Sequence, residues 1–173
     1  MSRANCSYFL AAAIVFAASS ASAHIRLENH EAAAGQPYKA IFAVPHGCAG
    51  SATIRIRVQI PEGVIAVKPM PKPGWNVEAI KGKYAAEYDY HGTKLTEGVK
   101  EVVWSGGKLP DDNYDEFVIS TFLADNLKPN TTLYFPTVQE CEKGISRWID
   151  IPEEGHETHG KSPAPWVKLM PET

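Results

Sequence analysis

The sequence predicts an all-β protein, an antiparallel β-sandwich of the immunoglobulin or cupredoxin type. Apolar and polar residues alternate with period two in many short stretches, and almost none of the chain has the period of a helix. The chain is also rich in turn-forming residues, with 13 glycines and 13 prolines. Short strands separated by such turns are typical of two sheets packed face to face.

The clearest strand is Thr53–Ile60. Its apolar residues at 54, 56, 58 and 60 share one side, whereas Arg55, Arg57 and Gln59 share the other, so one side faces a core and one faces water. Pro61-Glu62-Gly63 and His91-Gly92 are predicted turns, and the polar segment Glu153–Pro165 is a predicted loose crossing. The other predicted strands, in chain order, are Tyr38–Val44, Val64–Lys68, Trp75–Ile80, Tyr84–Tyr90, Val99–Trp104, Phe117–Leu123, Thr132–Phe135, Ser146–Ile151 and Trp166–Leu169.

Residues 1–23 have the features of a secretory signal peptide. Arg3 gives a positive start, Tyr8–Ala18 is apolar, and Ala21-Ser22-Ala23 is a small-residue cleavage site. The apolar run is shorter than the about 20 residues that a membrane span needs. We therefore predict one domain at residues 24–173, about 150 residues long, that is exported to the periplasm and is not anchored in a membrane.

The composition argues against several classes of function. The 17 Lys and Arg face 20 Asp and Glu, giving a formal net charge of −3, and no basic stripe runs between aromatic residues. Nucleic acid is therefore not an expected partner. The sequence also lacks a G-x-S-x-G elbow, a P-loop and a G-x-G-x-x-G fingerprint.

The cysteines agree with export. Cys6 leaves with the signal peptide, and the mature chain keeps Cys48 and Cys141. An even number of cysteines in an oxidising compartment favours a disulfide. The alternative is a pair of thiolate metal ligands, but neither cysteine has a neighbouring cysteine.

Cleavage after Ala23 would make His24 the first residue of the mature chain. Its α-amine and ring Nδ1 could then chelate one metal ion, an arrangement called a histidine brace. Nitrogen donors of this kind suit Cu(II), the tightest binder of the divalent series. The alternative is that the signal peptidase simply cuts before a residue without a metal role.

Two further residues are candidates for the same metal site. His46 follows Val44-Pro45, where proline ends a strand, and precedes Cys48, whose disulfide would hold the loop rigid. If Cys48 pairs with Cys141, the strand that carries Trp148 lies near this loop, and Trp148 could stack beside the metal. The alternatives are a solvated loop histidine and an ordinary core tryptophan.

The remaining polar candidates are weaker. His30 is expected in a polar turn and His91 at a hairpin tip, while His156 and His159 lie in the polar crossing. The acidic run from Asp111 to Glu116 lacks the spacing of a calcium loop, so we expect it to be a solvated loop.

Several short motifs, taken together and in order, resemble the YcnI-type family of secreted copper-binding proteins. Each is a weak match alone, but the ordered set runs over nearly the whole mature region. The motifs are the alanine before His24, Phe42-Ala43-Val44-Pro45, Pro61-Glu62-Gly63, Lys72-Pro73-Gly74-Trp75, Val102-Val103-Trp104-Ser105-Gly106-Gly107, Asp115-Glu116-Phe117, Leu133-Tyr134-Phe135-Pro136-Thr137-Val138-Gln139 and Arg147-Trp148.

The resemblance implies a β-sandwich that binds Cu(II) through one N-terminal histidine brace, a glutamate carboxylate and an adjacent tryptophan. His24 corresponds to the brace, and Trp148 corresponds to the tryptophan. The glutamate has no counterpart just after Val44-Pro45, where this chain has His46. We predict that His46 replaces it, and the carboxylates that stay open as alternatives are Glu28, Asp115 and Glu140.

The resemblance also implies a role and partners. Family members are often encoded beside copper-transport membrane proteins, so such a protein, or another periplasmic copper carrier, is the expected partner. We therefore predict a protein that holds or hands on Cu(II) and is not an enzyme. The two alternatives are a histidine-brace oxidative enzyme, such as a copper polysaccharide monooxygenase, and a structural or adhesion sandwich without a metal.

Overall fold

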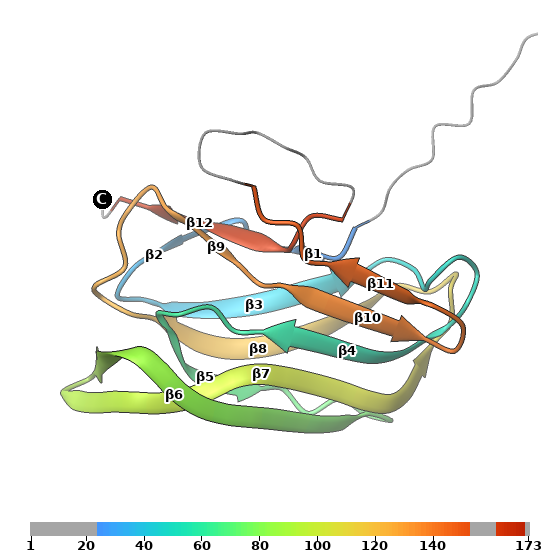
Figure 1. The fold of residues 1–173 in the computed structure, drawn as a ribbon, viewed down its shortest axis with the longest axis horizontal. Helices are drawn as coiled ribbons and strands as arrows, with labels where there is room; N and C mark the ends of the chain where they lie inside the picture. Colours follow the sequence, from blue (N-terminus) through green and yellow to red (C-terminus); the bar gives the residue numbers. More distant parts are fainter. Residues whose placement is uncertain (1–23, 153–161, 172–173) are drawn as a thin grey trace, which may run out of the picture.

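The computed structural model describes residues 24–152 and 162–171, and within these ranges all regular secondary structure is β-strand (Figure 1). Two antiparallel sheets pack face to face, which confirms the predicted β-sandwich. The first sheet has the order β1 (Arg26–Leu27), β3 (Pro37–Val44), β8 (Asp115–Leu123) and β5 (Val64–Pro69). The second has the order β11 (Ile145–Trp148), β10 (Thr137–Cys141), β4 (Thr53–Gln59), β7 (Thr93–Leu109) and β6 (Asn76–Tyr90).

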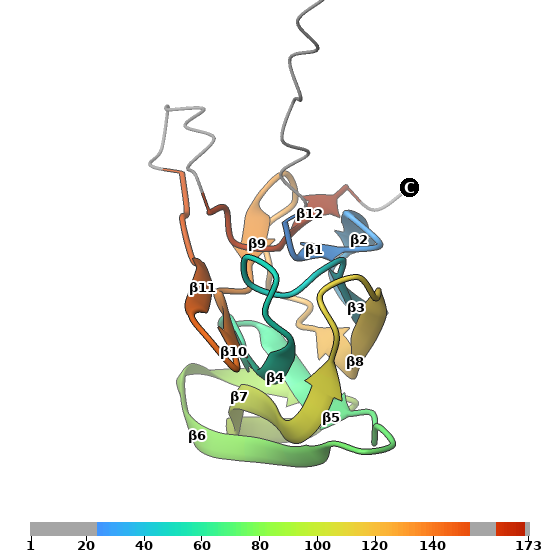
Figure 2. The same cartoon turned by 90° about the vertical axis from the view of Figure 1, so that its right-hand side faces the viewer.

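A small third sheet lies beside the edge strand β1, as Figure 2 shows. It consists of β2 (Glu31–Ala33), β12 (Trp166–Met170) and β9 (Thr132–Tyr134), and β2 pairs with β12 in parallel. Covering an edge in this way removes a template for pairing with other chains. It also brings the segment that leads into β12 next to the start of the domain.

The core lies between the two main sheets and is built around aromatic rings. Trp104 of β7 is fully buried and packs edge-on against Phe117 of β8, with ring centroids 5.4 Å apart. Trp75 is partly buried and contacts Phe117 from a second direction at 5.0 Å. Both tryptophans therefore pack on Phe117, and these contacts join the two sheets.

The longest hairpin differs from the sequence prediction in length. Trp75–Ile80 and Tyr84–Tyr90 were expected as separate strands, but residues 76–90 form the single strand β6. Val99–Trp104 is only the middle of β7. The predicted tip at His91-Gly92 is confirmed, with φ angles of 52° and 81°. Two positive angles are what a two-residue hairpin loop of type I′ requires.

The alternation in β4 holds except at its start. Ile56 and Val58 are buried and Arg55 and Arg57 exposed, as predicted, but Thr53 is fully buried while Ile54 is only half-buried. The pairing of β4 with both of its neighbours shifts register here. Because such a bulge inverts the phase of side-chain orientation, the prediction that Ile54 faces the core is wrong.

Strand β10 was not predicted, and its sequence explains why. Its buried residues are Thr137, Gln139 and Cys141, whereas Val138 and Glu140 are half-exposed. The inward side is therefore largely polar, so hydrophobic alternation gives no signal. The buried polar face of β10 is where the candidate site lies.

The polar crossing is partly outside the described residues, as are the signal segment, His156 and His159. Where it is described, it is tied down: the amide of Asp150 donates to the carbonyl of Ser162 at 3.0 Å, and the amide of Ala164 donates to Asp150 at 2.9 Å. The expectation of a loose segment is therefore wrong for residues 162–165. In the described part of the chain, no helix is long and apolar enough to cross a membrane.

Candidate metal centre

His24 is held in place by the residues that follow it. Ile25 and Leu27 are buried in the core, and Arg26 and Leu27 pair with Ala43 and Phe42 of β3. This anchoring leaves His24 half-buried, with its ring against the indole of Trp148. The ring centroids lie 5.2 Å apart, and the planes meet at 79° in an edge-to-face contact.

Trp148 ends β11 and is both a core residue and a neighbour of His24. Its side chain is 8% exposed and belongs to the main hydrophobic cluster. Its backbone pairs with Thr137 of β10. The indole Nε1–H donates a hydrogen bond of 3.0 Å to the Oε1 atom of Gln139, so the orientation of the ring is fixed.

Gln139 joins Trp148 to the loop that carries His46. It is 1% exposed, and its Nε2 group donates to the carbonyl oxygen of His46 at 2.7 Å and to the Oγ1 atom of Thr53 at 2.8 Å. The oxygen and both hydrogens of the amide are therefore used. A buried amide with this many partners holds its surroundings in one arrangement.

His46 has a defined tautomer in this loop. Its Nδ1 atom lies 2.5 Å from the carbonyl oxygen of Gly47. A carbonyl oxygen only accepts hydrogen bonds, so Nδ1 carries the proton, and the neutral ring has its lone pair on Nε2. Histidine ligands of metals commonly donate their second ring N–H to a carbonyl in this way.

The loop itself is rigid. The predicted disulfide between Cys48 and Cys141 is present, with Cα atoms 5.9 Å apart, and closes a separation of 93 residues. Native disulfides of this kind are worth about 2–5 kcal/mol. A Cβ atom at Gly47 would lie 1.9 Å from the carbonyl oxygen of Ser51, so only glycine fits the bend. The Gly47 amide also donates to Asp111 at 3.0 Å.

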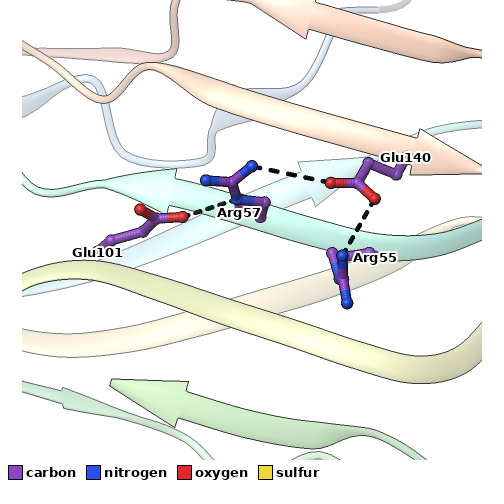
Figure 3. A network of polar contacts seen from close by, with 4 residues as sticks. All are labelled: Arg55, Arg57, Glu101 and Glu140. Atoms are coloured by element: carbon purple, nitrogen blue, oxygen red, sulfur yellow. Dashed lines mark hydrogen bonds and ion pairs between the residues drawn. The ribbon is translucent and has the colours of Figure 1, made fainter. Parts of the chain in front are cut away.

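The carboxylates named as alternative ligands take part in ion pairs. Glu28 pairs with Arg26 at 3.1 Å, Asp115 pairs with Lys72 at 2.7 Å, and Glu140 pairs with two arginines. Figure 3 shows Glu140 between Arg55 and Arg57 on the outer side of the second sheet, with Glu101 bound to Arg57 at 2.7 Å. Within residues 24–152 and 162–171, no cluster of three or more His, Cys, Asp or Glu side chains could hold a metal ion.

A family model described as a domain of unknown function, DUF1775, matches residues 24–169. The chain belongs to the DUF1775 family. The matched region of the DUF1775 domain starts at His24 and includes His46, Gln139 and Trp148.

A solved structure shows the same fold. The crystal structure of an uncharacterized protein from Nocardia farcinica, described as having an immunoglobulin-like fold, is similar over 86% of this chain and 99% of that chain. The TM-score is 0.60 and the sequence identity is 22%. The immunoglobulin-like fold of this DUF1775 domain is therefore established, and no curated protein matches the chain.

Two residues of the site were missed in the sequence. Gln139 lies two residues before Cys141, so strand alternation from a buried disulfide would have placed both on one face. Asp111 was assigned to a solvated loop, but its carboxylate holds the Gly47 amide next to His46. No local pattern indicates that contact, because Gly47 and Asp111 are 64 residues apart.

Proposed function

We propose that this DUF1775 domain is a periplasmic Cu(II)-binding protein of the YcnI type. After cleavage behind Ala23, the amine and ring of His24 hold the ion, with His46 Nε2 as a further ligand and Trp148 beside them. Its role is copper handling or delivery, with a copper-transport membrane protein or another periplasmic carrier as partner. The observation that carries the proposal is the chain of contacts from His24 through Trp148 and Gln139 to His46.

The proposed donors suit Cu(II) better than a hard cation. They are nitrogen atoms from His24 and His46, whereas the carboxylates of Glu28 and Glu140 are paired with arginines. Imidazole suits copper, whereas magnesium and calcium prefer oxygen ligands. Copper bound here would be cargo, and the protein's contribution would be to hold these nitrogens and to limit water access with Trp148.

The proposal requires a free amine at residue 24. Before cleavage this nitrogen is a peptide amide, which is a poor donor unless the metal displaces its proton. The start of the family match at His24 supports a domain that functions from this residue onward. The half-buried position of His24 between the buried Ile25 and Trp148 supports a chelate of fixed geometry.

The test is a one-residue extension. Protein beginning at His24 and protein with one extra alanine before His24 are titrated with Cu(II) in competition with a chelator. The extended protein should bind at least about tenfold more weakly, which corresponds to about 1.4 kcal/mol. The unfolding temperature of the two metal-free proteins should be the same, since the addition lies outside the core.

Equal affinities of the two proteins would refute the brace. The enzyme alternative has its own test, which is peroxide-driven oxidation of chitin or cellulose by the cleaved, copper-loaded protein. We expect no turnover above that of free Cu(II), because the site is built for holding the ion.

A further inference from the structure

A cavity opens beside His24. Its volume is about 250 Å³, and its walls come from two segments far apart in the sequence. One wall is formed by the start of the domain, with His24, Arg26 and His30, and the other is formed by residues 163–166, which lead into β12. The cavity is therefore assembled by the pairing of β12 with the N-terminal region.

The size of the cavity suits a hydrated metal ion. The cavity has room for several water molecules, so a divalent cation with its inner hydration shell fits in it. Copper arriving from solvent must exchange those waters for protein nitrogens. A ligand on the wall of the cavity would make that exchange stepwise.

His30 has the properties of such a ligand. Its Nδ1 atom lies 3.3 Å from the carbonyl oxygen of Trp166, and its ring packs against the Trp166 indole with centroids 4.7 Å apart. Because the carbonyl only accepts, Nδ1 is the donor, and the lone pair of the neutral ring is on Nε2. The ring is thus oriented, and its tautomer leaves Nε2 as the nitrogen that can bind a metal.

The positive charge nearby does not oppose a cation strongly. Arg26 also lines the cavity, but its guanidinium is paired with the carboxylate of Glu28 at 3.1 Å and its side chain is half-exposed. Water and Glu28 therefore screen much of its charge. Of the side chains that line the cavity, those of His24 and His30 carry imidazole rings, the kind of nitrogen donor that suits Cu(II).

We propose that this cavity is the entry vestibule of the N-terminal copper site and that His30 Nε2 is its transfer ligand. Cu(II) is held briefly by His30 on its way to and from the nitrogens of His24. This inference rests on the proposed function and adds a residue that acts on exchange but is not a permanent ligand.

The experiment measures exchange and equilibrium separately. Protein beginning at His24 is loaded with one Cu(II) and mixed with excess EDTA in a stopped-flow instrument. His30→Gln should slow copper transfer about fivefold or more while the equilibrium Kd stays within about twofold, because uptake and release slow together. His91→Gln is the matched control, since His91 lies at the β6–β7 tip against Tyr90 and Phe122. It should leave both quantities unchanged.

Three outcomes would overturn the vestibule. The first is a wild-type transfer rate in His30→Gln, and the second is equal slowing in His91→Gln. The third is a loss of equilibrium affinity in His30→Gln together with an altered electron paramagnetic resonance spectrum, which would make His30 a permanent ligand. An unchanged unfolding temperature of metal-free His30→Gln excludes a general structural effect. Failure of the proposed function gives a different result: the protein with an extra alanine before His24 would then bind Cu(II) as tightly as the protein that begins at His24.

Discussion

The ring of His24 packs edge-on against the indole of Trp148, with centroids 5.2 Å apart, and joins the start of the domain to the edge strand of the other sheet. Trp148 is in turn bonded to Gln139, which is bonded to the loop of His46. The residue predicted to be the first of the mature chain is therefore connected to the disulfide loop through one buried tryptophan and one buried amide.

Trp148 should report copper binding. Paramagnetic Cu(II) quenches nearby indole fluorescence, and Trp148 contacts the His24 ring directly. We expect titration with Cu(II) to quench the emission of the cleaved protein, and Trp148→Phe to remove most of that response. Trp75→Phe is the control, because Trp75 contacts Phe117 in the core. A full response in Trp148→Phe would place the ion away from this tryptophan.

His46 should contribute to affinity with little effect on folding. His46→Ala removes a ring whose lone pair is on Nε2, and we expect Cu(II) affinity to fall about tenfold or more, or about 1.4 kcal/mol. The free energy of unfolding of the metal-free protein should change by about 1 kcal/mol or less, because the ring is only half-buried. The electron paramagnetic resonance spectrum should also change. An unchanged spectrum with unchanged affinity would return His46 to a solvated loop residue.

Gln139 should matter for the stability of the fold. Gln139→Leu leaves the Trp148 Nε1–H, the His46 carbonyl and the Thr53 hydroxyl without this partner. Unsatisfied buried polar groups are costly, so we expect the free energy of unfolding to fall by about 2–4 kcal/mol. Urea denaturation measures it. Gln59→Leu, at an exposed position of β4, is the control and should have little effect. Equal stability of the two variants would contradict a structural role for the amide.

Glu62 should make stability depend on pH. Its carboxylate accepts hydrogen bonds from the Tyr88 hydroxyl at 3.0 Å and the Ala85 amide at 3.2 Å, and it pairs with Lys100. Partial burial alone would raise the pKa of Glu62, but these bonds, led by that of Lys100, outweigh it and lower the pKa. The unfolded chain therefore binds this proton more readily. The stabilisation is present above the unfolded pKa of about 4.3 and is lost as pH falls through the lower folded pKa.

The comparison with Glu62→Gln isolates this contribution. At pH 7 the wild type should be more stable by about 1 kcal/mol or less, because the carboxylate is partly exposed. Near pH 3 the difference should shrink. Urea midpoints at both values measure it, and a difference that does not change with pH would show that the ionised carboxylate is not what Lys100 and Tyr88 stabilise.

Much of the fold could be predicted from local pattern. Strands with one apolar and one polar side, such as β3 and most of β4, carry their orientation in their own sequence, and the turn at His91-Gly92 is specified by two residues. The strands that were missed lack that signal. β1 and β2 are only two and three residues long, and β10 faces inward with Thr137, Gln139 and Cys141.

For the candidate site, the sequence by itself determined which residues carry suitable chemistry and that Cys48 and Cys141 should pair. An imidazole, a thiol and a cleavage signal are properties of the residues themselves and of their immediate neighbours. Only the tertiary structure decided that His24 meets Trp148, that Gln139 bridges to His46, and that His30 shares a cavity with His24. The contact of His24 with Trp148 joins residues 124 positions apart. Such contacts form because sheet pairing and core burial bring distant segments together, which no local pattern encodes.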